Sequence, residues 1–172
     1  MSGLAVIVCG ACGRMGGTLL ELIGQAPGLR LAAAVDRAAD PAPGVYANLA
    51  DYQGPADVLI DFSTHTAAPG IVDYCVTRGI PLVMATTGHT PKEQAYIEAA
   101  GRSIALFQSA NMSMGVNLLA RLVQEAAAAL PGWDIEIVET HHNRKADAPS
   151  GTALMLARQV QASRPQSELT YG

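Results

Sequence analysis

The chain has 172 residues, of which 49% are hydrophobic and 15% are charged, and its net charge is −4. This composition excludes a disordered, highly charged protein, because it supplies enough apolar surface to build a core. The weak negative charge, without any cluster of Lys and Arg, gives no surface suited to a nucleic-acid backbone. No nucleic-acid partner is therefore expected.

The first predicted element is the apolar run Leu4–Cys9, which is typical of a parallel strand covered on both faces. The run is much shorter than the ~20 residues of a membrane span. It also lacks the basic leader and the cleavage site of a signal peptide. Three cysteines, an odd number, suit reduced thiols better than a disulfide framework. These features favour a cytoplasmic protein without a membrane partner.

Strand and helix signals then alternate as far as residue 108. A glycine loop leads into a helix, and Gly79 stands where a later helix is expected to end. The pattern predicts helices at residues 15–25, 66–78 and 91–102, and strands at 29–35, 58–62, 81–85 and 104–108. Residues 38–54 are expected to form an irregular surface excursion. This βαβα order predicts an open, largely parallel sheet with helices on both faces.

The pattern changes after Asn111. A long helix is predicted at residues 115–130, a strand with strict alternation at 134–140, and a helix at 151–163 after a polar loop. We therefore place a domain boundary between residues 111 and 115. The expected domains are 1–112 and 113–172.

The glycine loop Gly10–Gly16 reads GACGRMG and lies between a buried strand and a helix. In such a loop Gly10 permits the tight turn, Gly13 lets the backbone approach a pyrophosphate, and Gly16 allows helix and strand to pack closely. The free N–H groups at the start of the helix then face the phosphates. The spacing is G-x-x-G-x-x-G, because Cys12 stands where a glycine is often found. The loop predicts a dinucleotide cofactor.

An acidic residue follows the second strand, where the adenosine ribose is expected. Asp36 lies about 20 residues after Gly16, the usual place of the carboxylate that binds the ribose 2′-hydroxyl. Arg37 beside it can pair with a 2′-phosphate instead, so NADH and NADPH are both candidate cofactors. The alternative is a glycine loop that binds no cofactor.

Cys9 and Cys12 form a C-x-x-C pair, which raises the alternative of a redox site. That interpretation is disfavoured, because Cys9 completes an apolar strand and is expected to be buried. The glycines of the loop also have no role in a redox pair. Cys75 is interpreted as a core thiol.

A second polar loop carries His141, His142 and Lys145 and leads into a helix. Ser150 is a natural N-cap, which leaves the N–H groups of the next two residues free to bind an anion. With Arg144, these groups describe a site for a polyanionic small molecule that contains a proton donor. Metal binding is disfavoured, because adjacent histidines diverge on a strand and no Cys or carboxylate cluster completes a coordination shell. A solvated polar loop remains the alternative.

The chain resembles the 4-hydroxy-tetrahydrodipicolinate reductase (dihydrodipicolinate reductase) family. The resemblance rests on five blocks in the family's order, at residues 10–16, 61–63, 85–88, 109–117 and 136–153. The most specific is the HHxxKxDAPSGTA pattern in the last block. Two positions depart from the family: Ala85, where glycine is usual, and Met112, where an aromatic residue is common.

The resemblance implies an enzyme that uses NADPH or NADH to reduce 4-hydroxy-tetrahydrodipicolinate to tetrahydrodipicolinate in the diaminopimelate route to lysine. By position, His141 is the proton donor and Lys145 is a second proton-donating or substrate-polarising group. His142, Gly151 and Thr152 hold the cyclic dicarboxylate substrate, and no metal is involved. The implied cofactor-binding residues are Gly10, Ala11, Cys12, Gly13, Arg14, Met15, Asp36, Arg37, Ala85, Thr86, Thr87, Ser109, Ala110, Asn111 and Met112.

The family's chains form homotetramers and continue beyond the position of Gly172, so this chain is expected to lack much of the interface. We therefore expect an α/β fold, a Rossmann-type parallel sheet followed by the start of a second α+β substrate and oligomerisation domain that is incomplete. Weak or no activity is expected for the 172-residue chain itself. Two alternatives stay open: a truncated, non-catalytic NAD(P)-binding module, and another Rossmann reductase such as an amino-acid dehydrogenase.

Overall fold

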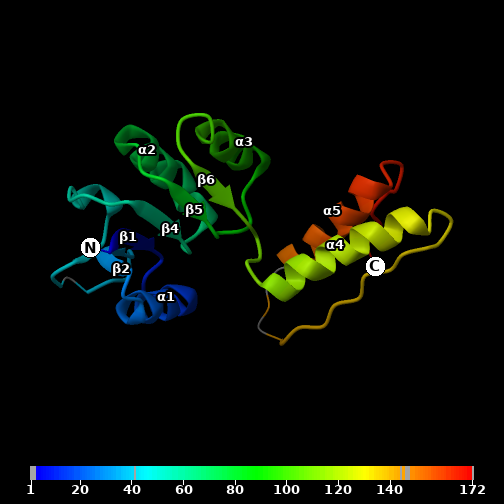
Figure 1. The fold of residues 1–172 in the computed structure, drawn as a ribbon, viewed down its shortest axis with the longest axis horizontal. Coiled ribbons are helices and arrows are strands. Elements are labelled where there is room, and N and C mark those ends of the chain that lie inside the picture. The colour runs from blue at the N-terminus through cyan, green and yellow to red at the C-terminus, as the bar shows by residue number, and fades with distance from the viewer. Residues whose placement is uncertain (1–2, 41, 144, 146–147, 172) are drawn as a thin grey trace. The chain divides into compact units, whose positions relative to one another are not determined.

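The computed structural model describes residues 3–40, 42–143, 145 and 148–171, and these form two compact units. The first unit ends at Ser109 and the second begins at Ala110 (Figure 1). Each unit has buried residues of its own. Within the described ranges, no helix is both long and apolar enough to cross a membrane.

The first unit is built around a parallel sheet. Its strands are β1 (Leu4–Cys9), β2 (Leu29–Val35), β3 (Val45–Tyr46), β4 (Val58–Asp61), β5 (Leu82–Met84) and β6 (Leu106–Gln108), in the order β3-β2-β1-β4-β5-β6. Along the chain, β2 and β3 therefore extend the sheet on one side of β1, and β4, β5 and β6 then extend it on the other side. In such sheets a ligand binds beyond the carboxyl ends of the strands where the order reverses.

The register of the strands brings their last residues to one edge. Cys9 pairs with Val35 on one side and with Asp61 on the other, and Asp61 pairs with Met84. Met84 pairs in turn with Gln108. The loops that follow these strands, including the glycine loop, therefore all leave from the same edge of the sheet.

Helices cover both faces of this sheet (Figure 1). The longer ones are α1 (Arg14–Gln25), α2 (Ala68–Arg78) and α3 (Pro91–Ala100), and the short 3-10 turns are η1 (Leu49–Asp51) and η2 (His65–Ala67). One core cluster joins strand residues such as Leu59 to Ile71 of α2 and Ile97 of α3. The other joins Val8 to Ile23 of α1. The continuous apolar strands are explained by this double coverage.

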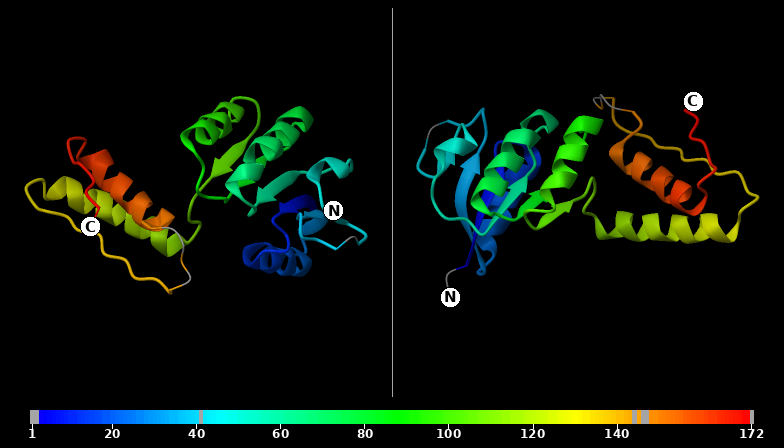
Figure 2. Two further views of the ribbon diagram at one scale, coloured as in Figure 1. Left: turned by 180° about the vertical axis from the view of Figure 1, so that it is seen from behind. Right: turned by 90° about the horizontal axis from the view of Figure 1, so that it is seen from above.

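The second unit contains α4 (Met114–Ala129) and α5 (Gly151–Ser163), which lie side by side in all views (Figures 1 and 2). Near their C-terminal ends, the hydroxyl of Ser163 donates a hydrogen bond to the carbonyl of Gln124. Near their N-terminal ends, Asn111 contacts Thr152. The two helices therefore run in the same direction. An extended segment, residues 134–140, lies in the chain between them.

The Rossmann-type α/β prediction is confirmed, and most of the predicted elements are present. The strands at 4–9 and 29–35 and the helix at 151–163 have the predicted bounds. The predicted helix at 66–78 begins with the turn η2, and that at 91–102 ends at residue 100. The short strand β3 lies inside the stretch that was predicted to be irregular.

The predicted strand at residues 134–140 is wrong. The segment is extended, but it belongs to no ladder in the described part of the chain. A strand needs the N–H and C=O groups of a neighbour, and the described residues of this unit supply none. The alternation of polar and apolar residues therefore predicted an extended backbone, but it did not show whether a neighbouring strand is present.

Candidate active site

The glycine loop has the backbone geometry that its sequence predicts. Gly10 has a φ of +78°, and a Cβ there would overlap the backbone of Phe62. A Cβ on Gly16 would overlap the carbonyl of Gly10, so this glycine lets α1 pack directly against the loop. Gly13 is the N-cap residue of α1 and provides no side-chain cap, and the first turn contains no acidic residue. The helix therefore presents its N–H groups and positive end to an anion.

A cavity of about 730 Å³ lies at the carboxyl ends of β1 and β2, a size within the usual range of small-molecule sites. Four of the predicted cofactor residues line it, namely Gly10, Gly13, Asp36 and Arg37. Residues 47–50 and the α2 residue Tyr74 form other parts of the wall. The cavity therefore joins the glycine loop to the acidic residue at the end of β2.

The carboxylate of Asp36 is held in place by two backbone groups. One oxygen accepts a hydrogen bond from the N–H of Cys12 at 3.1 Å, and the other accepts from the N–H of Ala38 at 2.9 Å. An ionised carboxylate has about four lone-pair sites, so acceptor capacity remains for a hydroxyl group of a ligand. Arg37 is exposed beside it.

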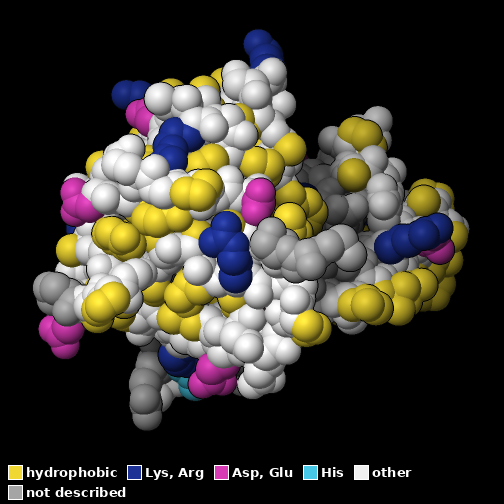
Figure 3. Space-filling model, turned by 60° about the vertical axis from the view of Figure 1, so that its left-hand side comes forward, with side chains coloured by type: hydrophobic (Ala, Val, Ile, Leu, Met, Phe, Trp, Pro, Cys, Tyr) yellow, Lys and Arg dark blue, Asp and Glu magenta, His cyan; other side chains and the backbone are white. Residues whose placement is uncertain are grey.

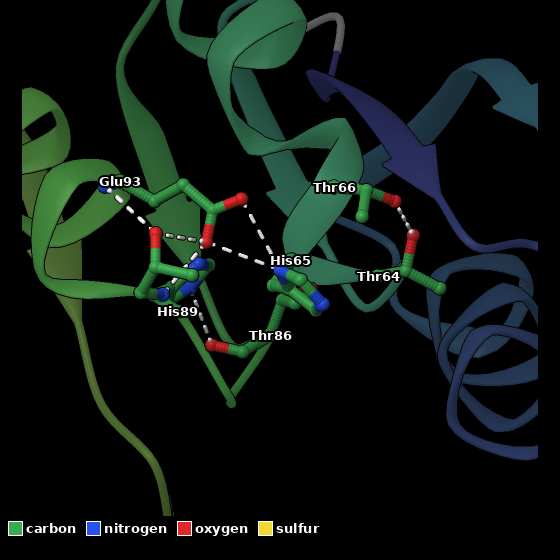
Figure 4. Close-up of polar contacts among 7 residues, drawn as sticks. Thr64, His65, Thr66, Thr86, His89 and Glu93 are labelled. Atoms are coloured by element: carbon green, nitrogen blue, oxygen red, sulfur yellow. Dashed lines mark hydrogen bonds and ion pairs between the residues drawn. The ribbon is translucent and has the colours of Figure 1, made fainter.

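The loop after β5 is held by a buried carboxylate that sequence reasoning did not select. Asp61 is fully buried, and it accepts hydrogen bonds from the hydroxyl of Thr86 at 2.7 Å and from the N–H and hydroxyl of Ser63. The carbonyl of Thr86 lies 3.0 Å from Nε2 of His89 (Figure 4). Thr86 is therefore held at both its hydroxyl and its carbonyl.

The end of the same loop is fixed by Glu93 at the start of α3. Thr90 and Glu93 form a reciprocal capping box, and the Glu93 carboxylate also lies 3.1 Å from Nδ1 of His65 (Figure 4). Hydrogen bonds from Thr90 lower the pKa of Glu93, and the contact with His65 lowers it further. The loop that carries the predicted residues Ala85, Thr86 and Thr87 is thus braced at both ends.

The cysteines do not form a reactive pair. Cys9 and Cys75 are buried, as expected, whereas Cys12 is exposed. Burial raises the pKa of the Cys9 thiol and, with Asp61 nearby, raises the pKa of Cys75 to about 12. Because the thiolate is the reactive species, these two thiols are unreactive at neutral pH.

In the second unit, the start of α5 brings several predicted residues together. Ser150 caps the helix, as predicted, by accepting a hydrogen bond from the N–H of Ala153 at 3.1 Å. The N–H groups of Gly151 and Thr152 lie in the first turn, where a helix offers them no carbonyl. The hydroxyl of Thr152 accepts a hydrogen bond from the side chain of Asn111 at 3.0 Å.

Glu139 is a further residue of this cluster that sequence reasoning missed. One of its carboxylate oxygens accepts a hydrogen bond from the N–H of Ser150 at 2.7 Å, and the other lies 3.6 Å from Nδ1 of His141. The backbone N–H of Lys145 donates to the carbonyl of His142 at 3.1 Å. Residue 144, which the sequence added to this site, lies outside the described residues, as do 146 and 147.

Within each of the two units, the structure thus brings some of the predicted site residues together. Ala11, Cys12, Arg14 and Met15 belong to the glycine loop and the start of α1 but do not line the cavity, and Ser109 directly follows β6. Within the described ranges, no group of three His, Cys, Asp or Glu side chains is placed to hold a metal ion.

Family models place both parts of the chain in one family. A model described as dihydrodipicolinate reductase, N-terminus, matches residues 4–112, and one described as dihydrodipicolinate reductase, C-terminus, matches residues 115–171. The chain belongs to the dihydrodipicolinate reductase family. This family consists of NAD(P)H-dependent oxidoreductases of the diaminopimelate route to lysine, which confirms the predicted enzyme class, cofactors and small-molecule substrate.

Curated relatives in the family are similar along nearly the whole chain. The 4-hydroxy-tetrahydrodipicolinate reductase of Caldanaerobacter subterraneus is 45% identical over 171 residues, which cover 98% of this chain and 68% of the relative. The enzyme of Anaeromyxobacter dehalogenans is 40% identical over 185 residues, covering 96% of this chain and 68% of the relative. The chain therefore spans about two thirds of the length of these family members.

Solved structures support the same fold. The dipicolinate-bound dihydrodipicolinate reductase from Paenisporosarcina sp. TG-14 superimposes with a TM-score of 0.73 at 24% identity, covering 98% of this chain and 69% of that one. A myo-inositol 2-dehydrogenase from Lactobacillus plantarum gives a TM-score of 0.57 at 15% identity, over 73% of this chain and 42% of that one. At these identities the likeness concerns the fold alone.

Proposed function

We propose that the protein reduces 4-hydroxy-tetrahydrodipicolinate to tetrahydrodipicolinate with NADPH or NADH, in the diaminopimelate route to lysine. The observation that carries this proposal is the presence of two site halves in one chain of the family. One is the glycine-loop cavity with Asp36, and the other is the cluster of His141, Lys145 and the start of α5. The proposed division of work is cofactor binding by residues 1–112 and substrate binding by residues 113–172.

The cofactor half follows from backbone groups and one acid. The N–H groups of the glycine loop and of the start of α1 bind the pyrophosphate, because they are donors at the positive end of a helix. Asp36 accepts hydrogen bonds from the adenosine ribose, and Arg37 pairs with a 2′-phosphate when NADPH is bound. The nicotinamide end is assigned to Ala85–Thr87 and Ser109–Met112, and the bound nicotinamide supplies the hydride.

In the substrate half, His141 donates the proton that accompanies the hydride, and Lys145 is the second proton-donating or substrate-polarising group. A carboxylate of the substrate binds the N–H groups of Gly151 and Thr152, where the dipole of α5 favours negative charge. His142 provides a further contact to the dicarboxylate. A general acid of this kind contributes roughly 10²–10⁴-fold to the rate.

Two further parts of the proposal rest on the family alone. We place the protein in the cytoplasm, and we expect a full-length protein that carries this sequence to assemble as a homotetramer, as the family does. Light scattering of the purified protein measures the second point. A mass equal to one chain would contradict it.

The direct test is an assay of NADPH and NADH oxidation by a full-length protein that carries this sequence, with freshly generated product of dihydrodipicolinate synthase. The proposal predicts turnover that depends on His141 and Lys145. A non-catalytic nucleotide-binding module would instead bind NADPH without turnover, and substitution of either residue would change no activity. Turnover with an amino acid from a substrate panel, but not with the synthase product, would favour an amino-acid dehydrogenase.

A further inference from the structure

Glu139 contacts two functional groups at once. Its Oε2 lies 3.6 Å from Nδ1 of His141, within ion-pair distance, and its Oε1 accepts a hydrogen bond from the N–H of Ser150 at 2.7 Å. His141 is the proposed proton donor, and Ser150 is the N-cap residue of α5, next to the proposed carboxylate site. A single carboxylate therefore connects the two parts of the substrate site.

The surroundings of Glu139 keep it ionised. Hydrogen bonds from Ser150 lower the pKa of its carboxyl group, and the charges of His141 and Lys145 lower it further. Its side chain is about a quarter exposed, against 41% for His141. Glu139 is thus a carboxylate at neutral pH, and its negative charge faces the imidazole.

A carboxylate beside Nδ1 decides which ring nitrogen takes part in chemistry. It favours a proton on Nδ1, because an N–H there is attracted by the negative oxygen 3.6 Å away, whereas a lone pair there would be repelled. Nε2 is then the atom left to exchange protons with a ligand. When His141 carries both protons, the negative charge of Glu139 lies beside the positive ring.

We propose that Glu139 is the positioning residue for His141: it holds the imidazole through Nδ1, makes Nε2 the proton-donating atom, and ties the ring to the start of α5. This inference rests on the proposed function. The 4-hydroxyl group of the substrate leaves as water, so that one hydride and one proton complete the reduction. In the proton step, the N–H bond at Nε2 of the imidazolium breaks, and its proton passes to the substrate that has accepted the hydride. Neutral His141 keeps its proton on Nδ1, and a proton from solvent restores the imidazolium.

The two contacts of Glu139 can be separated by substitution. Glu139→Gln keeps an oxygen that can accept the hydrogen bond from Ser150, and it removes the negative charge beside His141. Glu136→Gln is the matched control, because Glu136 is an exposed glutamate of the same extended segment. Glu139→Asp retains the charge and tests whether a carboxylate restores function.

The kinetic test is a double-substitution cycle on a full-length protein that carries this sequence, with kcat and KM measured for the wild type, Glu139→Gln, His141→Gln and the double variant. We expect Glu139→Gln to lower kcat about 10–100-fold with a change in KM of less than ~3-fold. In the His141→Gln background the same change should alter kcat by less than ~2-fold, because Glu139 acts through His141. Glu136→Gln should leave kcat unchanged, and Glu139→Asp should recover part of the lost rate.

A second readout needs no turnover. The ¹⁵N chemical shifts of His141 report which ring nitrogen carries the proton. They are expected to show Nδ1–H in the wild type and a shift towards Nε2–H in Glu139→Gln. Equal losses of kcat in both backgrounds, or unchanged nitrogen shifts, would overturn the role of Glu139. A wild type without turnover would contradict the proposed function instead, and the nitrogen shifts would then decide the role of Glu139 by themselves.

Discussion

The two units hold their site residues by different means. In the first unit, the proposed cofactor loops follow strands that contain fully buried side chains, such as Val8 and Leu59 at 0% exposure. In the second unit, the residues that pack α4 against α5 are mainly small, and Leu118 and Leu122 of α4 are about half exposed. Hydrophobic side chains are accordingly visible on the molecular surface (Figure 3).

This difference distinguishes the proposed cofactor site, which is positioned mainly by packing, from the proposed substrate site, which is positioned mainly by hydrogen bonds. The proposed cofactor site is a consequence of an apolar core, which fixes the carboxyl edge of the sheet within a tightly packed structure. The substrate cluster depends instead on single polar contacts, such as those of Glu139 and Asn111. Substitutions in the glycine loop should therefore act through packing, and substitutions in the cluster around His141 should act through individual hydrogen bonds.

The largest effect is expected at Gly16. Gly16→Ala places a Cβ on the backbone of Gly10, which the glycine loop can relieve only by moving. We expect a loss of about 3 kcal/mol in the free energy of unfolding and at least ~10-fold weaker NADPH binding. Gly17→Ala is the control, because a Cβ there meets nothing within 4 Å, and it should stabilise α1 by up to ~1 kcal/mol. Urea unfolding and NADPH titration measure both; equal behaviour of the two variants would refute the packing account.

The next effect concerns the buried carboxylate. Thr86→Val removes one donor to Asp61 and leaves that charge less well satisfied in the core. We expect a loss of about 2 kcal/mol in the free energy of unfolding. Thr87→Val, at an exposed position, should change it by less than ~0.5 kcal/mol. Chemical denaturation of both variants tests this, and a neutral Thr86→Val would show that the contact does not stabilise the fold.

A smaller effect is expected at the C-terminal end of α4. Arg164 donates hydrogen bonds to the carbonyls of Ala127, Leu130 and Trp133. Arg164→Ala leaves these carbonyls to water and removes a positive charge from a helix C-terminus, which should cost about 1–1.5 kcal/mol in the second unit. Arg121→Ala breaks only an exposed i,i+4 pair with Glu125 and should cost less than ~0.5 kcal/mol. Hydrogen exchange of α4 amides distinguishes them, and faster exchange in Arg121→Ala than in Arg164→Ala would contradict the prediction.

The smallest effect is a pH dependence at Glu93. Its pKa is lowered in the folded protein, mainly by Thr90, so the carboxylate stabilises the fold above the ordinary pKa of a glutamate. That stabilisation is lost as the pH falls through the lowered pKa. Glu93→Gln should therefore have a lower thermal midpoint than the wild type at pH 7, and the difference should shrink as the pH falls below the ordinary pKa of a glutamate and through the lowered one. A difference that does not change with pH would exclude this linkage.

Local sequence signals predicted most of the fold. Continuous apolar runs gave the bounds of β1 and β2 correctly, and glycine and proline residues marked the ends of helices. The strand predicted at residues 134–140 failed because alternation describes one strand, whereas a ladder needs two. The strand β3 was missed because two residues carry no detectable period.

The site was predictable where its chemistry is local in sequence. The glycine loop is a short motif between a strand and a helix, and this context predicted a dinucleotide site. The roles of His141 and Lys145 came from the resemblance to the family and stay predictions. Asp61 and Glu139 were missed because their partners are distant, Thr86 being 25 residues from Asp61 and Ser150 being 11 residues from Glu139. Contacts of this kind depend on the tertiary fold.

The proposal that NADPH binding and proton transfer depend on different residues is tested most directly by His141→Gln. Its affinity for NADPH, from quenching of protein or cofactor fluorescence, should stay within ~2-fold of the wild type, because His141 lies outside the cofactor cavity. Its kcat with the synthase product should fall by roughly 10²–10⁴-fold, the usual contribution of a general acid. An unchanged kcat would contradict the account, because His141 would then not be the proton donor.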